Sequence, residues 1–161
     1  MVENKVENFK PFCIYKDYAF TIEHTMFFDV PEYLIFFFNK DKPLHDQNPQ
    51  ILSNLGNILA LTTLCIKEVT KTNYVYCLSF GEKVNIPHFH LFPRTLKIKK
   101  EYQSRHLNSK EEFISGPDLF AWIMKNKNRS YHHMEHISEK ISNRFITLKG
   151  RYYKGVYSSN V

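Results

Sequence analysis

Two histidines one residue apart carry the strongest chemical signal in this chain of 161 residues. They lie in the nonapeptide IPHFHLFPR, which we predict to be a β-strand, with side chains alternating between its two faces. The alternation places His88 and His90 on one face, together with Ile86, Phe92 and Arg94. Two imidazoles that share a face indicate a chemical site or a metal site.

The opposite face of this strand is apolar, so it can pack on a core while the imidazoles point outward. Its residues are Pro87, Phe89, Leu91 and Pro93. A buried histidine needs a hydrogen-bond partner and adds little apolar burial, so the pair is a poor core element. The plainer alternative is two surface histidines on a strand. A zinc site would need a third ligand, and the pattern supplies none, so we expect no metal and no other cofactor.

The elements that position these histidines lie mostly upstream. We predict strands at residues 12–15, 18–24, 33–38 and 74–80. Asn48 and Pro49 are typical of a helix start, and apolar residues follow at helical spacing as far as Lys71. A tight connection at 81–83 predicts that the last two strands pair as a hairpin. The fold class is α+β, an antiparallel sheet of about five strands covered by one long helix.

The C-terminal third has a different character. We predict a solvated basic loop at 97–105, a helix that begins at Gly116, a second helix at 132–146, and a strand or tail at 147–161. We expect a flexible tail at 1–11, a core at 12–96, and a helical extension at 97–161 that packs on the core within one domain.

A second group of histidines, His132, His133 and His136, lies within this extension. The first and last are one helical turn apart, a spacing that can hold a metal. No acidic or cysteine partner has a recognisable place, so we expect a solvated helix face. A capping box at residues 109–112 precedes the Gly116 helix.

Composition limits the class of protein. The chain is 43% hydrophobic and 16% aromatic, which indicates a globular fold. A net charge of +6 fits either solubility or an anionic ligand such as phosphate or nucleic acid. Three cysteines without a Cys-x-x-Cys spacing argue against a disulfide framework and fit a reducing compartment. With no visible secretory signal and no long apolar run, we expect a cytoplasmic protein without a membrane partner.

Residues 81–94, GEKVNIPHFHLFPR, resemble the signature of the histidine triad (HIT) superfamily, in which three histidines alternate with apolar residues. The upstream order of strands, long helix and strand agrees, so the resemblance covers roughly residues 12–94. The match departs at the first histidine, which is Ile86 here. The resemblance implies an antiparallel HIT-like fold and a homodimer.

The resemblance also implies roles for the two histidines that are present. His88 would be the nucleophile that attacks the α-phosphorus of a nucleotide and forms a nucleotidyl-histidine, with its other ring nitrogen donating to a backbone carbonyl. His90 would stabilise charge on the phosphate. The loss of the first histidine puts leaving-group protonation in doubt more than it does the fold.

The same resemblance suggests residues that bind the substrate. They are Ser79, Gly81, Glu82, Lys83 and Val84 near the phosphate, and Phe20 and Glu23 near the base and ribose. Lys83 stands where the family has Ser or Thr, and its point charge suits phosphate. For Phe20 a core position is the preferred interpretation.

These inferences lead to one main functional hypothesis and two alternatives. The main one is a nucleotide hydrolase or nucleotidyltransferase acting on a nucleoside phosphoramidate or dinucleoside polyphosphate. The first alternative is a catalytically weak nucleotide-binding module, which Ile86 favours. The second is a processing protein for nucleotidylated nucleic-acid ends, supported only by the basic stretch after Arg94. We expect a nucleotide substrate rather than a nucleic-acid partner.

Overall fold

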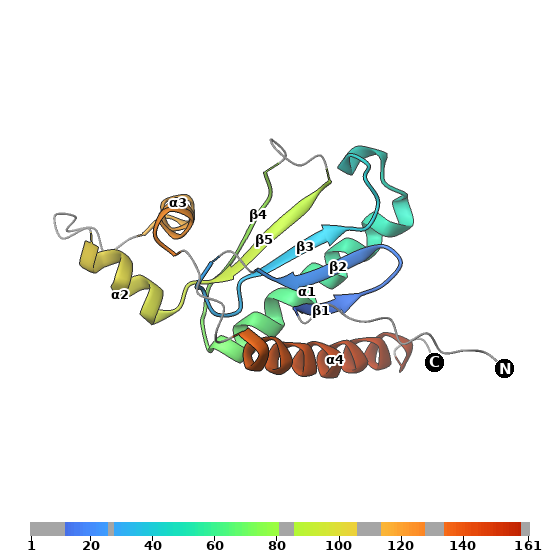
Figure 1. Ribbon diagram of the computed structural model, residues 1–161. Coiled ribbons are helices and arrows are strands. Elements are labelled where there is room, and N and C mark those ends of the chain that lie inside the picture. The colour runs from blue at the N-terminus through green and yellow to red at the C-terminus, as the bar shows by residue number, and fades with distance from the viewer. Residues whose placement is uncertain (1–11, 26–27, 81–85, 106–113, 128–133, 159–161) are drawn as a thin grey trace.

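The computed structural model describes residues 12–25, 28–80, 86–105, 114–127 and 134–158, and its centre is a five-stranded antiparallel sheet (Figure 1). The strands are β1 (Cys13–Lys16), β2 (Phe20–His24), β3 (Leu34–Phe38), β4 (Val75–Leu78) and β5 (His88–Pro93). Their order across the sheet is β1-β2-β3-β5-β4, and every neighbouring pair is antiparallel. The predicted α+β class and the pairing of the last two strands are confirmed.

The helices are α1 (Pro49–Thr70), α2 (Leu96–Arg105), α3 (Gly116–Asn126) and α4 (Met134–Ser158), with a short 3-10 turn η1 (Leu44–Asp46) before α1. The Asn48 side chain accepts a hydrogen bond from the Gln50 amide at 2.8 Å, and Pro49 occupies the first turn, so the predicted start of α1 is confirmed. Helix α3 begins at Gly116 as predicted, capped by Ser115.

Two predictions for the C-terminal third are wrong. Residues 97–105 form helix α2 instead of a loop, because Ile98 is buried and Tyr102 packs on the ring of Trp122, which gives the basic segment an anchored face. Residues 147–158 continue helix α4 instead of forming a strand or tail. The tail at 1–11 and the capping box at 109–112 lie outside the described residues.

The two faces of the sheet enter two separate apolar clusters. The first, which we call the main core, joins one sheet face to α1 and α4 and includes Phe20, Leu34, Phe36, Ile58, Leu91 and Phe145. The second, which we call the α3 core, joins the other face to α2 and α3 and includes Tyr33, Phe92, Ile98, Leu119, Trp122 and Ile123. Figure 1 shows α1 and α4 running along the sheet, with α2 and α3 at the left, past the end of β5. The histidines therefore lie on the sheet face opposite the main core, the face that packs toward α3.

Helix α1 is long and apolar enough, by length and composition alone, to cross a membrane. Six of its side chains are nevertheless buried, among them Ile58, Leu61 and Ile66, in contact with the sheet and α4. Burial of this kind is typical of the core helix of a globular protein, whose apolar stripe faces a sheet.

Candidate active site

His88 and His90 both rise from β5 on the face opposite the main core. Antiparallel pairing sets His88 beside Phe37 and His90 beside Ile35 of β3, and both imidazoles are half-buried. Their ring centroids are 5.1 Å apart at an interplanar angle of 73°. The predicted alternation along β5 is therefore observed, but the face is less open than expected because Phe92 is fully buried in the α3 core.

The expected place of Ile86 is wrong. Strand β5 begins at His88, so the alternation does not reach back to Ile86. Its side chain packs instead against the main core, the cluster on the other side of the sheet. Only its backbone reaches the site, where the carbonyl oxygen lies 2.9 Å from His88 Nδ1.

That contact determines the protonation of a neutral His88. A carbonyl oxygen only accepts hydrogen bonds, so Nδ1 carries the proton and donates it to Ile86. Nε2 of His88 then has a free lone pair, the form required of an imidazole nucleophile. Ser79, which directly follows β4, also helps to hold His88, because its Oγ donates to the His88 carbonyl at 2.8 Å.

His90 has a different partner, the hydroxyl of Tyr33, which lies 2.9 Å from its Nδ1. Tyr33 is fully buried, and burial raises the pKa of its hydroxyl above the ordinary value of 10.0. Burial, and then the neighbouring His88, lower the pKa of His90 from 6.5 to about 4. At neutral pH both groups are therefore uncharged, and the phenol keeps its proton.

Aromatic rings form the walls around the two imidazoles. Phe120 of α3 and Phe80 after β4 lie with their ring centroids 5.5 and 6.3 Å from that of His90. Phe37 lies 6.1 Å from His88 on the other side. Half-enclosing rings lower the local polarity, which strengthens any hydrogen bond made inside them.

Two of the expected substrate residues, Glu23 and Phe20, lie on opposite faces of the sheet. Glu23 of β2 is in register with Ile35 and, through it, with His90, so these three positions share one face. Glu23 is two strands away, which corresponds to roughly 10 Å. Phe20 points to the opposite face, 1% exposed in the main core, so it does not line the site and the preferred core interpretation is correct.

Several other expected residues belong to segments outside the described part of the chain. Gly81, Glu82, Lys83 and Val84 lie outside the described residues, as do His132 and His133. Within the part of the chain that the structure describes, no group of three or more His, Cys, Asp or Glu side chains could hold a metal. None of the three cysteines forms a disulfide.

Sequence reasoning missed Tyr33 and Phe120. For Tyr33 a signal existed, because it alternates with Ile35 and Phe37, but the register between β3 and β5 was needed to connect it to His90. For Phe120 the sequence holds no signal, because its position depends on how α3 packs over the sheet.

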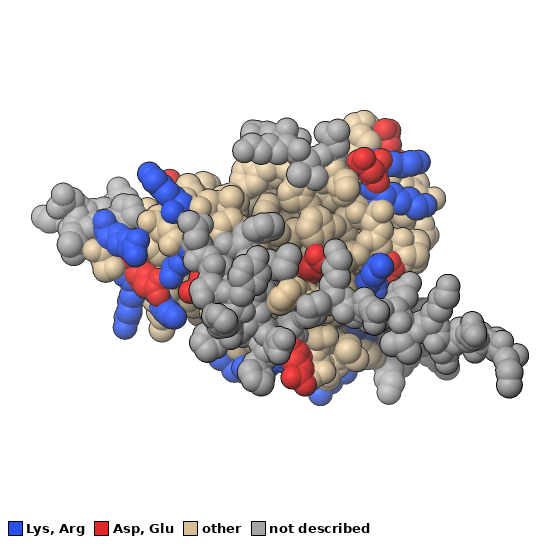
Figure 2. All heavy atoms as spheres, viewed as in Figure 1, with Lys and Arg blue, Asp and Glu red and all other residues tan. Residues whose placement is uncertain are grey.

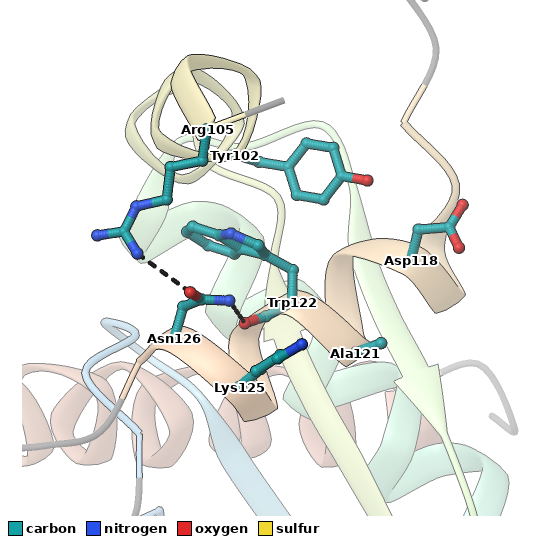
Figure 3. Close-up of a pocket in the computed structure, with 7 residues that line it drawn as sticks. All are labelled: Tyr102, Arg105, Asp118, Ala121, Trp122, Lys125 and Asn126. Carbon is teal, nitrogen blue, oxygen red and sulfur yellow. Dashed lines mark hydrogen bonds between the residues drawn. The ribbon is translucent and has the colours of Figure 1, made fainter. Parts of the chain in front are cut away.

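A cavity of about 450 Å³ lies apart from these residues, between α2 and α3 (Figure 3). Arg105 and Asn126 line it and are joined by a hydrogen bond of 3.1 Å from Nη1 to Oδ1. Asn126 also donates to the Trp122 carbonyl at 2.9 Å, so these polar groups satisfy one another. The lining has no imidazole or thiol, and the histidine strand remains the better candidate for chemistry.

No protein-family model matches the chain, and no curated protein sequence matches it significantly. Solved structures do resemble it. A hypothetical histidine triad nucleotide-binding protein from Sulfolobus tokodaii gives a TM-score of 0.59 at 15% identity, covering 86% of this chain and 85% of that chain. Diadenosine triphosphate hydrolase from Plasmodium falciparum gives 0.57 at 13% identity, covering 83% and 76%. A Hit-like protein involved in cell-cycle regulation from Bartonella henselae gives 0.55 at 15%, covering 82% and 85%.

At these identities the likeness shows the fold alone. The chain has the fold of histidine triad proteins, and it spans most of the length of each of the three structures. The predicted HIT-like fold is thereby confirmed.

Proposed function

We propose, from the histidine triad fold and the state of its two histidines, that this chain processes nucleotides. The reaction is hydrolysis or nucleotidyl transfer at the α-phosphate of a dinucleoside polyphosphate or nucleoside phosphoramidate, through a nucleotidyl-histidine on His88. One observation carries the proposal. The Nδ1 atoms of the two imidazoles have partners with opposite hydrogen-bonding roles, an accepting carbonyl for His88 and a donating hydroxyl for His90.

These partners favour opposite tautomers. The Ile86 carbonyl requires a proton on His88 Nδ1 and leaves Nε2 as a lone pair. The buried Tyr33 hydroxyl needs an acceptor, and neutral His90 offers one at Nδ1, so the His90 proton lies on Nε2. One ring thus supplies a nucleophile and the other a donor for a phosphate oxygen.

In the first step the His88 Nε2 lone pair attacks the α-phosphorus, an N–P bond forms, and the bond to the leaving group breaks with its electron pair. The imidazole becomes cationic, and the Ile86 carbonyl at Nδ1 stabilises that charge. His90 Nε2–H donates to a non-bridging oxygen as negative charge develops there. In the second step water attacks phosphorus and releases a proton to the solvent, the N–P bond breaks with its electron pair, and His88 regains its lone pair.

The isoleucine at position 86 affects which leaving group the site favours. A polyphosphate leaves as a stable anion, whereas an amine must receive a proton as it leaves. Isoleucine has no proton to give, and its side chain packs in the main core. The proposal therefore favours dinucleoside polyphosphates over phosphoramidates. A homodimer and a cytoplasmic location stay predictions.

The test is capture of the covalent intermediate. The protein is mixed with a dinucleoside polyphosphate, quenched in denaturant, and its intact mass is measured for the addition of one nucleotide. We expect the addition in wild type, none in His88→Ala, and a slower one in His90→Ala. The matched control is His45→Ala, because His45 is exposed on η1 and should label as wild type does.

A second candidate function is nucleotide binding without turnover, which the apolar Ile86 favours. Wild type that binds a nucleotide in calorimetry but is never labelled would support this binding module and exclude the enzyme. Labelling that persists in His88→Ala would place the nucleophile elsewhere.

A further inference from the structure

A basic cavity of about 550 Å³ lies at the far end of β5 from His88, where α1 ends and β4 and α2 begin. Four of its lining side chains are cationic: Lys71, Arg94, Lys97 and Lys99. None of the described residues that line it is acidic. We refer to these four residues and the space between them as the basic cavity. A concave surface with charges of one sign concentrates oppositely charged ligands.

The arginine of this cavity is held in place by the fold. The Arg94 guanidinium lies 5.2 Å from the centroid of the Tyr74 ring, and its Nη1 donates to the Tyr76 hydroxyl at 3.2 Å. The Arg94 carbonyl accepts a hydrogen bond of 2.7 Å from Thr72, which is itself 7% exposed. An arginine with a fixed position loses less side-chain entropy when it binds an anion.

Lys97 and Lys99 stand where the helix itself disfavours them. They lie in the first turn of α2, which contains no acidic residue. The helix dipole makes this end positive, so a cation here is destabilising and an anion stabilising. A residue choice that opposes the local fold is expected where a ligand compensates for it. A bound phosphate group would compensate for both lysines.

The cationic surface extends beyond the space that one phosphate group would occupy. Lys71 also lines a neighbouring cavity of about 530 Å³ between α1 and α4, together with Lys140 and Arg144. Arg144 of that second cavity is ion-paired with Glu68, so the positive charge that continues there belongs to Lys71 and Lys140. Figure 2, in the view of Figure 1, shows Lys and Arg side chains over α2 at the left of the molecule. A surface of this extent fits a chain of phosphates better than a single anion.

We propose that the basic cavity binds the phosphate backbone of single-stranded nucleic acid. The choice of nucleic acid rests on Tyr74, which lines the cavity and is 60% exposed, because aromatic rings beside cations provide stacking surfaces for unpaired bases. This inference departs from the expectation of a nucleotide substrate without a nucleic-acid partner, and it does not depend on turnover at His88.

The test uses full-length His88→Ala protein, so that binding is measured without any reaction. Fluorescence anisotropy follows a labelled single-stranded oligonucleotide across a range of salt concentrations. We expect Lys97→Gln/Lys99→Gln to weaken binding about tenfold and to reduce the salt slope by about 1.4, the value for two lost phosphate contacts. The melting temperature of this double variant should equal that of the parent protein or exceed it, because the substitutions remove two unfavourable charges from the start of α2.

The matched control is Lys16→Gln/Lys42→Gln, which removes the same charge from exposed positions on β1 and before η1. It should bind as the parent protein does. Equal weakening in both double variants would show binding by net charge alone and overturn the proposal. So would binding of inorganic polyphosphate with no binding of the oligonucleotide, or binding only to vesicles of anionic lipid.

Discussion

The Tyr33 hydroxyl oxygen lies 2.9 Å from Nδ1 of His90, although the two residues are 57 positions apart in the chain. The contact arises because β3 and β5 are paired with Ile35 beside His90, so Tyr33 and His90 belong to the same sheet face. A fully buried phenol thereby holds one tautomer of the second histidine. The site is therefore a pair of imidazoles in different states rather than two equivalent histidines.

Tyr33→Phe should slow turnover at saturating substrate about tenfold, equivalent to roughly 1.4 kcal/mol, with little change in KM. The substitution removes the hydroxyl but keeps the ring, so His90 loses the contact that selects its tautomer. Steady-state kinetics measure the rate, and ¹⁵N chemical shifts of the imidazole report the tautomer. Tyr18→Phe, at an exposed tyrosine, should change neither. An unaltered tautomer in Tyr33→Phe would contradict the assigned role.

Ile86→His should not increase activity, even though it restores the third histidine of the motif. The Ile86 side chain packs against the main core, on the sheet face opposite His88. A histidine there would bury a polar ring, and we expect a loss of about 1–2 kcal/mol in the free energy of unfolding. Urea unfolding and the rate of nucleotide labelling measure the two effects. A faster label would show that residue 86 can reach the site.

Gly116→Ala and Gly56→Ala should have opposite effects on stability. A Cβ at Gly116 would lie 2.7 Å from Cε1 of Tyr76, a ring held against Phe92, so either the ring or α3 must move. A Cβ at Gly56 meets no atom within 4 Å. We expect Gly116→Ala to cost about 1–3 kcal/mol and Gly56→Ala to stabilise by about 0.5–1 kcal/mol.

Urea unfolding of both glycine variants measures these changes. Because α3 carries Phe120 over His90, Gly116→Ala should also alter the environment of that imidazole. Two stabilised variants would mean that Tyr76 yields easily and that α3 is not fixed by this contact.

The protein should lose stability as the pH falls from about 6.5 to about 4. The pKa of His90 is about 4 in the fold and 6.5 ordinarily, so within this window the unfolded chain binds a proton that the folded chain does not. The free energy of unfolding therefore decreases with falling pH and levels off below the folded pKa. Urea unfolding at about pH 7 and about pH 4.5 measures the difference. The difference should be smaller in His90→Asn, which has no imidazole at position 90.

Several elements could be predicted because their signals are local. Asn48 and Pro49 define the start of α1, since capping and proline geometry act within one turn. Helix α2 could have been predicted as well, because Lys, Leu, Glu and Arg are good helix formers. Its charge led to the interpretation as a loop, and the burial of Ile98 that anchors it is a tertiary contact.

The sequence by itself determined that two histidines share one face of a strand and that the long helix α1 covers the sheet, because both are matters of periodicity along the chain. Only the tertiary structure decided which ring nitrogens are free. Strand register brings Tyr33 to His90, and the turn before β5 sends the Ile86 side chain to the main core while its carbonyl stays with His88. These contacts join segments through packing, and no spacing within either segment encodes them.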